Sequence, residues 1–555
     1  MKRIYVFLLI CLVTLSISCN NKFLEVAPEV ALDEDKVFAD PVLAAQFADN
    51  AYRYRPDDYL RWMSVTGTSQ VTDEAVGTDI TSNLIYTFQK GLYHDHALIN
   101  PTTLSDRYQL NEVSGVWTMC YTGIRIVNKM LPRIDQVAWT AEQNPARIKG
   151  EMYYLRAFMY FELIKRFGGV VIIDKAYLPT DDIDFPRSTY DECVAFILKD
   201  IEKAIVALPD DYDQANYGRA TAGAARALKS RLLLYAASPL HNASGDVVKW
   251  KAAADAAKAV MDMNKYTLHP IYSEILSPPG NGTTNEYILI KVRGPRDSSY
   301  PSLSVVSPGS GGRIGEFNPT QNHVDLYEMS NGLPITDPQS GYDPANPYAK
   351  RDPRFYANIL YNDAPWQSRK MQMWDGGADY TSNNTSYTTT GYYCRKMWPE
   401  AFKTPFTQTA LLNFVFFRYG EILLNYAEAQ NEAVGPDASV YNAINQIRSR
   451  SAMPDLPGGL TKDQMRARIR NERAVELAFE DHRLYDAQRW KKGVEIIAQP
   501  IYGINVVKNT NGTFTYTPKK LTDFYQRVFE DYMHLYPIPK TEIQKSKKMV
   551  QNPGW

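Results

Sequence analysis

Residues 145–167 read PARIKGEMYYLRAFMYFELIKRF, and residues 188–208 read STYDECVAFILKDIEKAIVAL. Apolar side chains recur three or four positions apart in both segments, at Ile148, Met152, Leu155, Met159 and Leu163, and at Tyr190, Val194, Ile197, Ile201 and Ile205. This period places each set on one face of a helix. Ser188, with Asp191 three residues later, predicts a capping-box start, and Leu208-Pro209 predicts the end. The stretch therefore predicts two amphipathic helices joined by a short connection.

The same helical pattern continues along the chain. It recurs at 220–238, 248–264, 414–434, 438–451 and 461–492. The Ala-rich segment 220–238 permits close helix approach until Pro239. Because these helices come in pairs with short connections, they predict a mainly α fold built from tetratricopeptide-like hairpins, although no literal repeat of about 34 residues is present. Strand signals are few: 169–173, 286–292, and a hairpin around Asn511-Gly512.

Two stretches, 57–110 and 270–412, break the helical pattern. Both are rich in Gly, Pro, Ser, Thr and Asn, with aromatic residues interspersed. Long irregular segments in a compact protein are typically functional loops or disorder. The dense Trp and Tyr residues within 361–400 argue against disorder. We therefore expect a single domain over 41–555, in which a helical scaffold (mainly 41–56, 111–269 and 413–555) presents a loop-rich ligand region.

Composition narrows the functional classes. The 555 residues include 61 Lys+Arg and 62 Asp+Glu, a net charge of −1, which lacks the basic footprint of a nucleic-acid binder. An apolar content of 45% and a charged content of 22% disfavour disorder and a polytopic membrane protein. Aromatic residues are abundant, with 38 Tyr, 21 Phe and 9 Trp. Tyr and Trp combine an apolar face with a polar tip, which suits binding surfaces as well as cores.

The N-terminus is typical of an export signal. Lys2 and Arg3 precede a short apolar run, 4–15, and Ser16-Ile17-Ser18 then precedes Cys19. This order predicts a signal peptide over 1–18 and a bacterial lipoprotein acylated on Cys19, with a tether over 19–40. Leu15 lies four residues before the Cys instead of three, and plain secretion with a structural Cys19 is the alternative. Cys120, Cys193 and Cys394 suggest neither a disulfide framework nor a zinc site and are interpreted as small buried hydrophobes.

Catalytic and metal-binding motifs are absent from the sequence. Gly309 to Gly315 lacks the third glycine of a dinucleotide fingerprint, and His94 and His96 have no third ligand nearby. No cofactor, metal or catalytic residue is therefore predicted. In the charged segment 461–492, Arg473 with Glu476 and Glu480 with Arg483 have the i,i+3 spacing of helix-stabilising pairs. They favour a structural ion-pair network over an anion site.

Several segments along the chain resemble the SusD/RagB family of outer-membrane nutrient-binding lipoproteins. They are CNNKFLEVAP (19–28), RFGGVVIIDKAYLP (166–179), RATAGAARALKSRLLLYAASP (219–239), FRYGEILLNYAEA (417–429), AINQIRSRSAMP (443–454), RNERAVELAFEDHRLYDAQRW (470–490) and LYPIPKTEIQKSKKMVQNPGW (535–555). The resemblance implies about four tetratricopeptide-like helix pairs, a loop-rich ligand region, surface exposure at the outer membrane, and a partner TonB-dependent transporter of the SusC type. The matching segments belong mainly to the helical scaffold. The resemblance therefore supports expectations about the fold and the partner but not about the identity of the ligand.

The expected activity is binding without chemistry. Sugar rings have an apolar face and a rim of hydroxyls, which aromatic and polar side chains can match. The aromatic candidates are Trp62, Tyr86, Tyr93, Tyr300, Trp366, Trp374 and Trp398, with Asp73, Arg293 and Arg296 as polar partners. For each single aromatic residue, core packing is the alternative. Peptide capture in the manner of RagB, a glycoside hydrolase on a helical scaffold, and a pure protein-interaction scaffold remain the competing functions.

Overall fold

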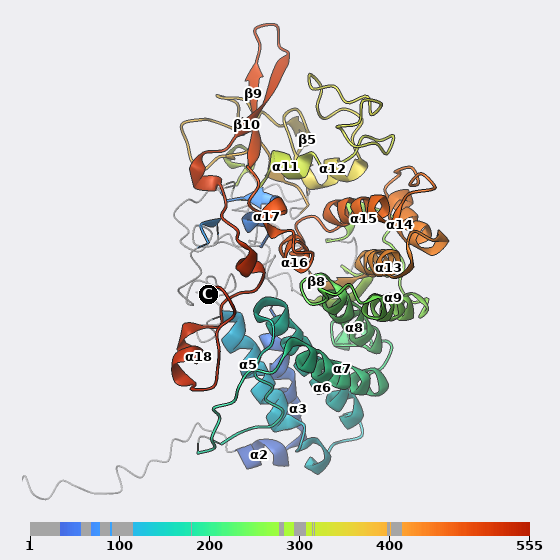
Figure 1. Cartoon of the computed structure of the whole chain (residues 1–555), viewed down its shortest axis with the longest axis vertical. Helices are drawn as coiled ribbons and strands as arrows, with labels where there is room; N and C mark the ends of the chain where they lie inside the picture. The colour runs from blue at the N-terminus through green and yellow to red at the C-terminus, as the bar shows by residue number, and fades with distance from the viewer. Residues whose placement is uncertain are drawn as a thin grey trace, which may run out of the picture.

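The computed structural model describes residues 34–56, 68–77, 89–91, 115–178, 180–276, 282–292, 307–312, 315, 317–396, 400 and 413–555. Within them the chain is mostly helical, with a few short strands (Figure 1). The N-terminal helices form one end of the molecule, and a β-hairpin projects from the other end (Figure 1). The mainly α fold class is thereby confirmed. The division into tether, scaffold and ligand region stays a prediction.

The helices pack in series along the chain. Each helix from α5 to α9 contacts the next one in sequence, and α9 then packs against α13, which contacts α14 and α15. This nearest-neighbour order is the packing expected of helical hairpins. The helices are α2 (Glu34–Ala39), α3 (Pro41–Asn50), α5 (Gly115–Met130), α6 (Pro145–Phe167), α7 (Tyr190–Ala207), α8 (Ala222–Ala237), α9 (Val247–Met261), α11 (Gln321–Val324), α12 (Pro353–Asn358), α13 (Tyr419–Val434), α14 (Ala438–Arg450), α15 (Lys462–Glu476), α16 (Arg483–Arg489), α17 (Gly493–Ile496) and α18 (Lys540–Lys545).

The strands of the described residues form two-stranded antiparallel sheets only. The pairs are β1 (Ala75–Val76) with β3 (Asn318–Pro319), β2 (Tyr287–Lys291) with β8 (Phe414–Arg418), β4 (Ile359–Leu360) with β7 (Tyr393–Cys394), β5 (Pro365–Trp366) with β6 (Arg369–Lys370), and β9 (Tyr502–Lys508) with β10 (Phe514–Lys520). The predicted strand at 286–292 and the hairpin around Asn511-Gly512 are confirmed.

The starts of α7 and α13 differ from the prediction. The capping box of α7 is formed by Thr189 and Glu192, one residue beyond the predicted pair Ser188 and Asp191, because Thr189 is the residue with an extended backbone and its hydroxyl accepts from the Glu192 N–H. The predicted helix 414–434 begins only at Tyr419. Its first five residues pair with β2 instead, since their buried aromatic side chains fit a strand.

The charged segment 461–492 is not one helix. α15 ends at Glu476, and α16 begins at Arg483. Between them Phe479 and Asp481 have φ of 64° and 60°, a left-handed conformation that cannot continue a helix. The predicted i,i+3 pairs are therefore wrong, because Arg473 pairs with Asp486 and Arg483 pairs with Asp73.

The predicted strand at 169–173 is absent. Side chains of neighbouring helices bind this extended segment in place of a partner strand. Tyr121 donates to the Val171 carbonyl, Asn128 donates to the Ile173 carbonyl, and the Ile173 N–H donates to the Tyr160 hydroxyl. The backbone groups are thus satisfied without a sheet.

Buried ion pairs join the elements of the C-terminal half. The Arg418 guanidinium at the end of β8 contacts the carboxylates of Glu286, Glu476 and Glu480, and Arg354 of α12 also reaches Glu476. All five side chains are at most 6% exposed. The structural ion-pair network predicted for segment 461–492 is therefore confirmed, with partners from other elements. In the described part of the chain, no helix has the length and apolarity needed to cross a bilayer.

Candidate functional site

Most ligand candidates proposed from the sequence fall outside the described residues. These are Trp62, Tyr86, Tyr93, Arg293, Arg296, Tyr300 and Trp398, together with the acylation candidate Cys19. Asp73, Trp366 and Trp374 fall within them. Cys120, Cys193 and Cys394 are buried in the core, as predicted, and none of the three forms a disulfide with another described residue.

Asp73 and Trp366 have structural roles. Both side chains are 1% exposed. The Asp73 carboxylate accepts from the Nε and Nη2 atoms of Arg483 at 2.8 and 2.7 Å. Successive side chains of β5 point to opposite faces, so Pro365 points outward and Trp366 points into the core. Neither side chain is open to a ligand, which corrects the prediction for both.

Trp374 is half-buried beside the turn end of the projecting hairpin, next to the strand pair Lys508 and Phe514. Its ring packs against Phe514, with 5.1 Å between ring centroids, and the Lys508 ammonium lies 4.7 Å from its centroid. Both partners come from the strands of the hairpin, β9 and β10. Trp374 therefore keeps an accessible edge and remains a ligand candidate.

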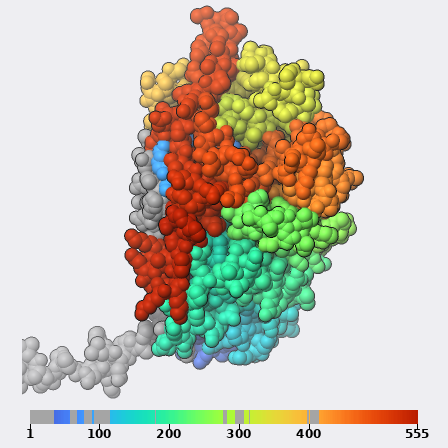
Figure 2. Space-filling view, in the orientation of Figure 1, coloured from blue at the N-terminus to red at the C-terminus, as the bar shows by residue number. Residues whose placement is uncertain are grey.

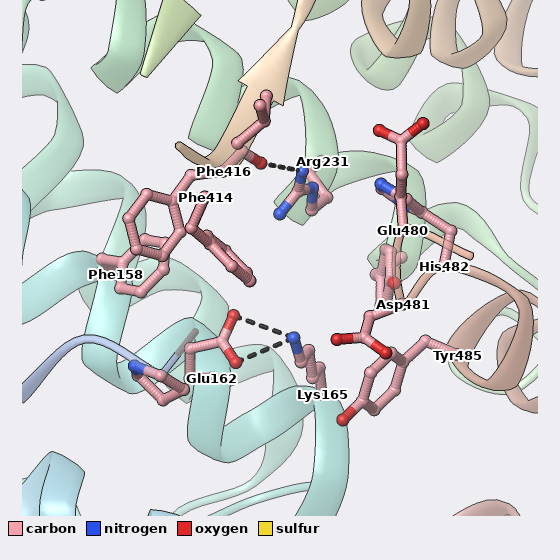
Figure 3. Close-up of a pocket in the computed structure, with 13 residues that line it drawn as sticks. Phe158, Glu162, Lys165, Arg231, Phe414, Phe416, Glu480, Asp481, His482 and Tyr485 are labelled. Atoms are coloured by element: carbon pink, nitrogen blue, oxygen red, sulfur yellow. Dashed lines mark hydrogen bonds and ion pairs between the residues drawn. The ribbon is translucent and has the colours of Figure 1, made fainter. Parts of the chain in front are cut away.

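A small pocket lies where α6, α8, β8 and the segment before α16 meet (Figure 3). Its volume of about 40 Å³ suits a water molecule rather than a sugar ring. Glu162 pairs with Lys165, and Arg231 donates to the Phe416 carbonyl (Figure 3). Arg231 also pairs with Glu421, which lies outside the pocket lining. This pocket is therefore part of the ion-paired interior and not a ligand cleft.

The described residues also form a much larger open groove of about 660 Å³. Its three walls are α5, the segment 171–183, and the C-terminal segment 542–549, which includes part of α18. The C-terminal segment runs along one face of the molecule to reach this position beside the N-terminal helices (Figure 2). Ligand pockets in proteins span roughly 300–1,000 Å³, so the groove has the size of a binding site.

The floor of the groove is aromatic. Trp117 and Tyr121 lie one turn apart on α5, with 5.1 Å between their ring centroids, and Trp117 packs edge-on against Phe167. Trp117 is 7% exposed. The Tyr121 hydroxyl donates to the Val171 carbonyl at 2.8 Å, and burial raises the pKa of this phenol well above its ordinary value. Tyr121 therefore stays protonated and holds the second wall against the first.

The second wall adds a third ring and two cations. Tyr177 is half-buried and packs against Phe185 at 5.3 Å between centroids. Arg125, two turns beyond Trp117 on α5, donates from Nη1 to the Tyr177 carbonyl at 3.0 Å. The Lys175 ammonium lies 4.9 Å from the centroid of the Tyr177 ring. Rings and hydrogen-bonding groups thus alternate along the groove.

The third wall is fastened to the second by polar contacts. Arg187 donates to the carbonyls of Gly169, Phe167 and Val550 and to the Asn552 side chain, at 2.7–3.0 Å. The Ser546 hydroxyl and the Lys547 N–H both donate to the Asp184 carboxylate. A groove whose walls are held in this way needs little ordering when a ligand binds.

Analysis of the sequence alone missed this groove. Trp117, Tyr121 and Arg125 recur every four residues, with Thr118 and Thr122 beside them, which is the spacing of a helix face. That signal was available in the sequence. The contributions of 171–183 and 542–549 had no such signal, because those segments lie more than 350 residues apart and meet only through tertiary contacts.

Comparisons with known proteins identify the family. A sequence profile described as "SusD family" matches residues 279–555, and a second, described as "Starch-binding associating with outer membrane", matches residues 22–234. The chain belongs to the SusD family. Among its SusD relatives, the SusD-like protein P38 of Formosa agariphila is 24% identical over 416 residues, which cover 70% of this chain and 74% of the relative.

Solved structures of the SusD family share the fold. A SusD-like protein from Bacteroides fragilis superposes with a TM-score of 0.77 at 27% identity, covering 95% of this chain and 99% of that one. A "laminarin binding SusD-like protein" superposes with a TM-score of 0.63 at 21% identity, covering 93% and 99% of the two chains. In the described residues of the present chain, no group of three or more His, Cys, Asp or Glu side chains is placed to hold a metal ion.

Proposed function

We propose that this SusD-family chain is an outer-membrane lipoprotein that binds oligosaccharides at the cell surface and delivers them, unaltered, to a TonB-dependent transporter of the SusC type. The groove carries the proposal, because it combines an aromatic floor with hydrogen-bonding walls in a single open site. The starch-binding description of one matching profile and the name of the laminarin-binding structural neighbour support it.

The groove chemistry suits a sugar chain. A pyranose ring presents an apolar face that packs on flat, half-buried rings such as Tyr177. Its hydroxyls need hydrogen-bonding partners once water is displaced, and Thr118, Thr122 and Arg125 supply them along the same helix face. Trp374 lies beside the projecting hairpin, at the other end of the molecule, and is a candidate for a separate ligand contact.

Delivery follows from tethering. Acylation of Cys19 would hold the protein beside a transporter in the same membrane, and a tethered binder acts at a high effective concentration. Modest affinity is then sufficient to capture a ligand. It also allows the ligand to dissociate quickly into the transporter. The energy for import would come from the transporter.

Peptide capture is the second candidate function. Leu178 and Ile183, which line the groove, are 65% and 64% exposed. Exposed aliphatic side chains at a rim suit apolar peptide side chains better than sugar hydroxyls. This observation favours including peptides among the ligands tested.

Calorimetric titration of the purified chain with neutral glycans, acidic glycans and peptides tests the proposal. We expect saturable binding to at least one glycan class and no product on chromatography of the recovered ligand. Cleavage of the ligand would identify an enzyme, and binding of peptides alone would favour the second candidate.

Tyr177→Ala tests the groove itself. Removing this half-buried ring should weaken glycan binding about tenfold or more while leaving the melting temperature nearly unchanged. Tyr502→Ala, which removes a 37% exposed ring from β9, is the matched control and should alter neither quantity. A large fall in melting temperature for Tyr177→Ala would assign the ring to the core instead.

A further inference from the structure

Basic side chains line all three walls of the groove. Arg125 comes from α5, Lys175 from the segment 171–183, and Lys545 from α18. Glu542 is the single acidic residue among the lining residues. Three independent segments thus bring positive charge to one hollow of an almost neutral protein.

These cations are available to a ligand. Arg125 makes one hydrogen bond, to a backbone carbonyl, and Lys175 lies over the Tyr177 ring. Neither has a carboxylate within ion-pair distance among the described residues. Lys545 pairs with Glu542 at 3.1 Å, but the Lys545 side chain is 73% exposed, so the pair is hydrated and the ammonium exchanges readily to another anion.

Many arginines of the scaffold are neutralised by buried carboxylates. Arg418 contacts three carboxylates, and Arg489 pairs with Glu428 and Asp486. Both arginines are buried. The cations that line the groove therefore differ from the structural ion pairs of the scaffold in exposure and in pairing.

Two acidic residues beside the groove, Asp181 and Asp184, already accept hydrogen bonds within the protein. The Asp181 carboxylate accepts from the Leu178 N–H at 2.7 Å, and the Asp184 carboxylate accepts from Ser546 and Lys547. These contacts hold the walls together. The Asp181 and Asp184 carboxylates therefore do not neutralise Arg125 or Lys175, and both cations can interact with a ligand in the groove.

We propose that the groove selects anionic oligosaccharides, with Arg125, Lys175 and Lys545 binding carboxylate or sulfate groups while Tyr177 and the aromatic floor pack against sugar rings. This inference rests on the proposed function and names its substrate class. A guanidinium binds a carboxylate or sulfate through paired N–H donors, whereas a neutral sugar leaves the cations without a partner. Uronate and sulfate esters present the same negative oxygens, so both fit the groove.

Titration of the purified full chain separates the ligand classes. The probes are tetragalacturonate, a sulfated galactan tetrasaccharide, neutral laminaritetraose and maltotetraose, and an oligoglutamate peptide of similar charge. We expect at least one acidic sugar to bind tenfold or more tightly than either neutral one. That preference should shrink as salt rises from 50 to 500 mM, because salt screens exposed charges.

A triple variant, Arg125→Gln with Lys175→Gln and Lys545→Gln, should lose the preference for acidic sugars while keeping its binding of neutral ones. All three side chains are exposed, so the fold should tolerate the change. The control variant, Lys251→Gln with Lys258→Gln and Lys519→Gln, removes the same charge from exposed positions on α9 and β10 and should keep the preference.

The outcomes distinguish this inference from the function on which it rests. Neutral and acidic sugars binding equally, or a preference that survives in the triple variant, would overturn the inference and leave glycan capture standing. Oligoglutamate binding alone would show that the cations serve a peptide. If no sugar binds at all, the proposed function itself fails.

Discussion

Arg418 shows how strongly one residue can depend on its surroundings. Its guanidinium is 1% exposed and meets three buried carboxylates, those of Glu286, Glu476 and Glu480. The neighbouring arginines hold the pKa of Glu476 well below its ordinary value, although burial alone would raise it. The charges in this cluster are tolerated only because all of them are present together.

Removing the central cation should therefore be costly. Arg418→Met would remove a cation that contacts three buried carboxylates, and we expect a loss of about 3–5 kcal/mol in the free energy of unfolding, measured by urea titration. Lys370→Met, which breaks an exposed pair with Asp363, is the control and should leave the urea midpoint unchanged. Equal effects of the two substitutions would contradict the structural role of the network.

Glu74 provides a residue-scale pH prediction. Its carboxyl is buried beside β1 and accepts from the Phe479 N–H at 3.1 Å. Burial raises the pKa of Glu74 from 4.5 to about 8. Between these values the folded chain keeps a proton that the unfolded chain releases, so this group makes stability fall as pH rises from about 4.5 to about 8.

Glu74→Gln should remove that contribution. The amide keeps a hydrogen-bond acceptor for Phe479 but does not ionise, so the variant should gain stability relative to the parent chain as pH rises, by up to about 1.4 kcal/mol per pH unit. Urea midpoints at pH 5, 6.5 and 8 measure the difference. Glu202→Gln, at an exposed position of α7, should show no such trend. A difference that is constant with pH would mean that Glu74 ionises normally.

At the scale of elements, the groove depends on a contact between distant segments. Arg187, in the segment before α7, donates two hydrogen bonds to the segment after α18 and two more to the carbonyls of Phe167 and Gly169. The C-terminal segment makes no strand pairing here, so these contacts and the Asp184 contacts fix the third wall.

Arg187→Met should loosen that wall. We expect amide hydrogen exchange in residues 540–552 to accelerate about tenfold or more, with α6 and α8 unaffected, and acidic-sugar affinity to fall with it. Lys199→Met, at an exposed position of α7, controls for loss of a cation and should leave exchange unchanged. Unaltered exchange in 540–552 would show that apolar packing alone holds the wall.

At the scale of the whole molecule, the proposed function requires attachment to a membrane. Cys19→Ser should release the protein from the membrane fraction, because the acyl chains would be lost. Fractionation of expressing cells followed by immunoblotting measures this. Cys11→Ser is the matched control, since bulky Ile10 precedes Cys11, and should leave the protein membrane-bound. Membrane retention of Cys19→Ser would place the anchor elsewhere.

Local sequence pattern determined the helices of the scaffold. The spacing of Ile148, Met152 and Leu155 predicts α6, which is observed from Pro145 to Phe167. Helix periodicity is a property of neighbouring residues and is therefore readable without tertiary contacts. The segments that resemble SusD/RagB proteins also predicted the SusD fold, because they consist mainly of residues of the helical scaffold.

Tertiary structure alone decided which side chains are available to a ligand. Trp366 is aromatic and lies in a loop region, yet it is sealed in the core, whereas the half-buried Tyr177 lines a groove with residues of α5 to which no local pattern joins it. Exposure depends on what distant segments cover, and α18 reaches the groove from the far end of the chain. The sequence by itself thus determined the helical scaffold and its family, and long-range packing decided the position and the charge of the site.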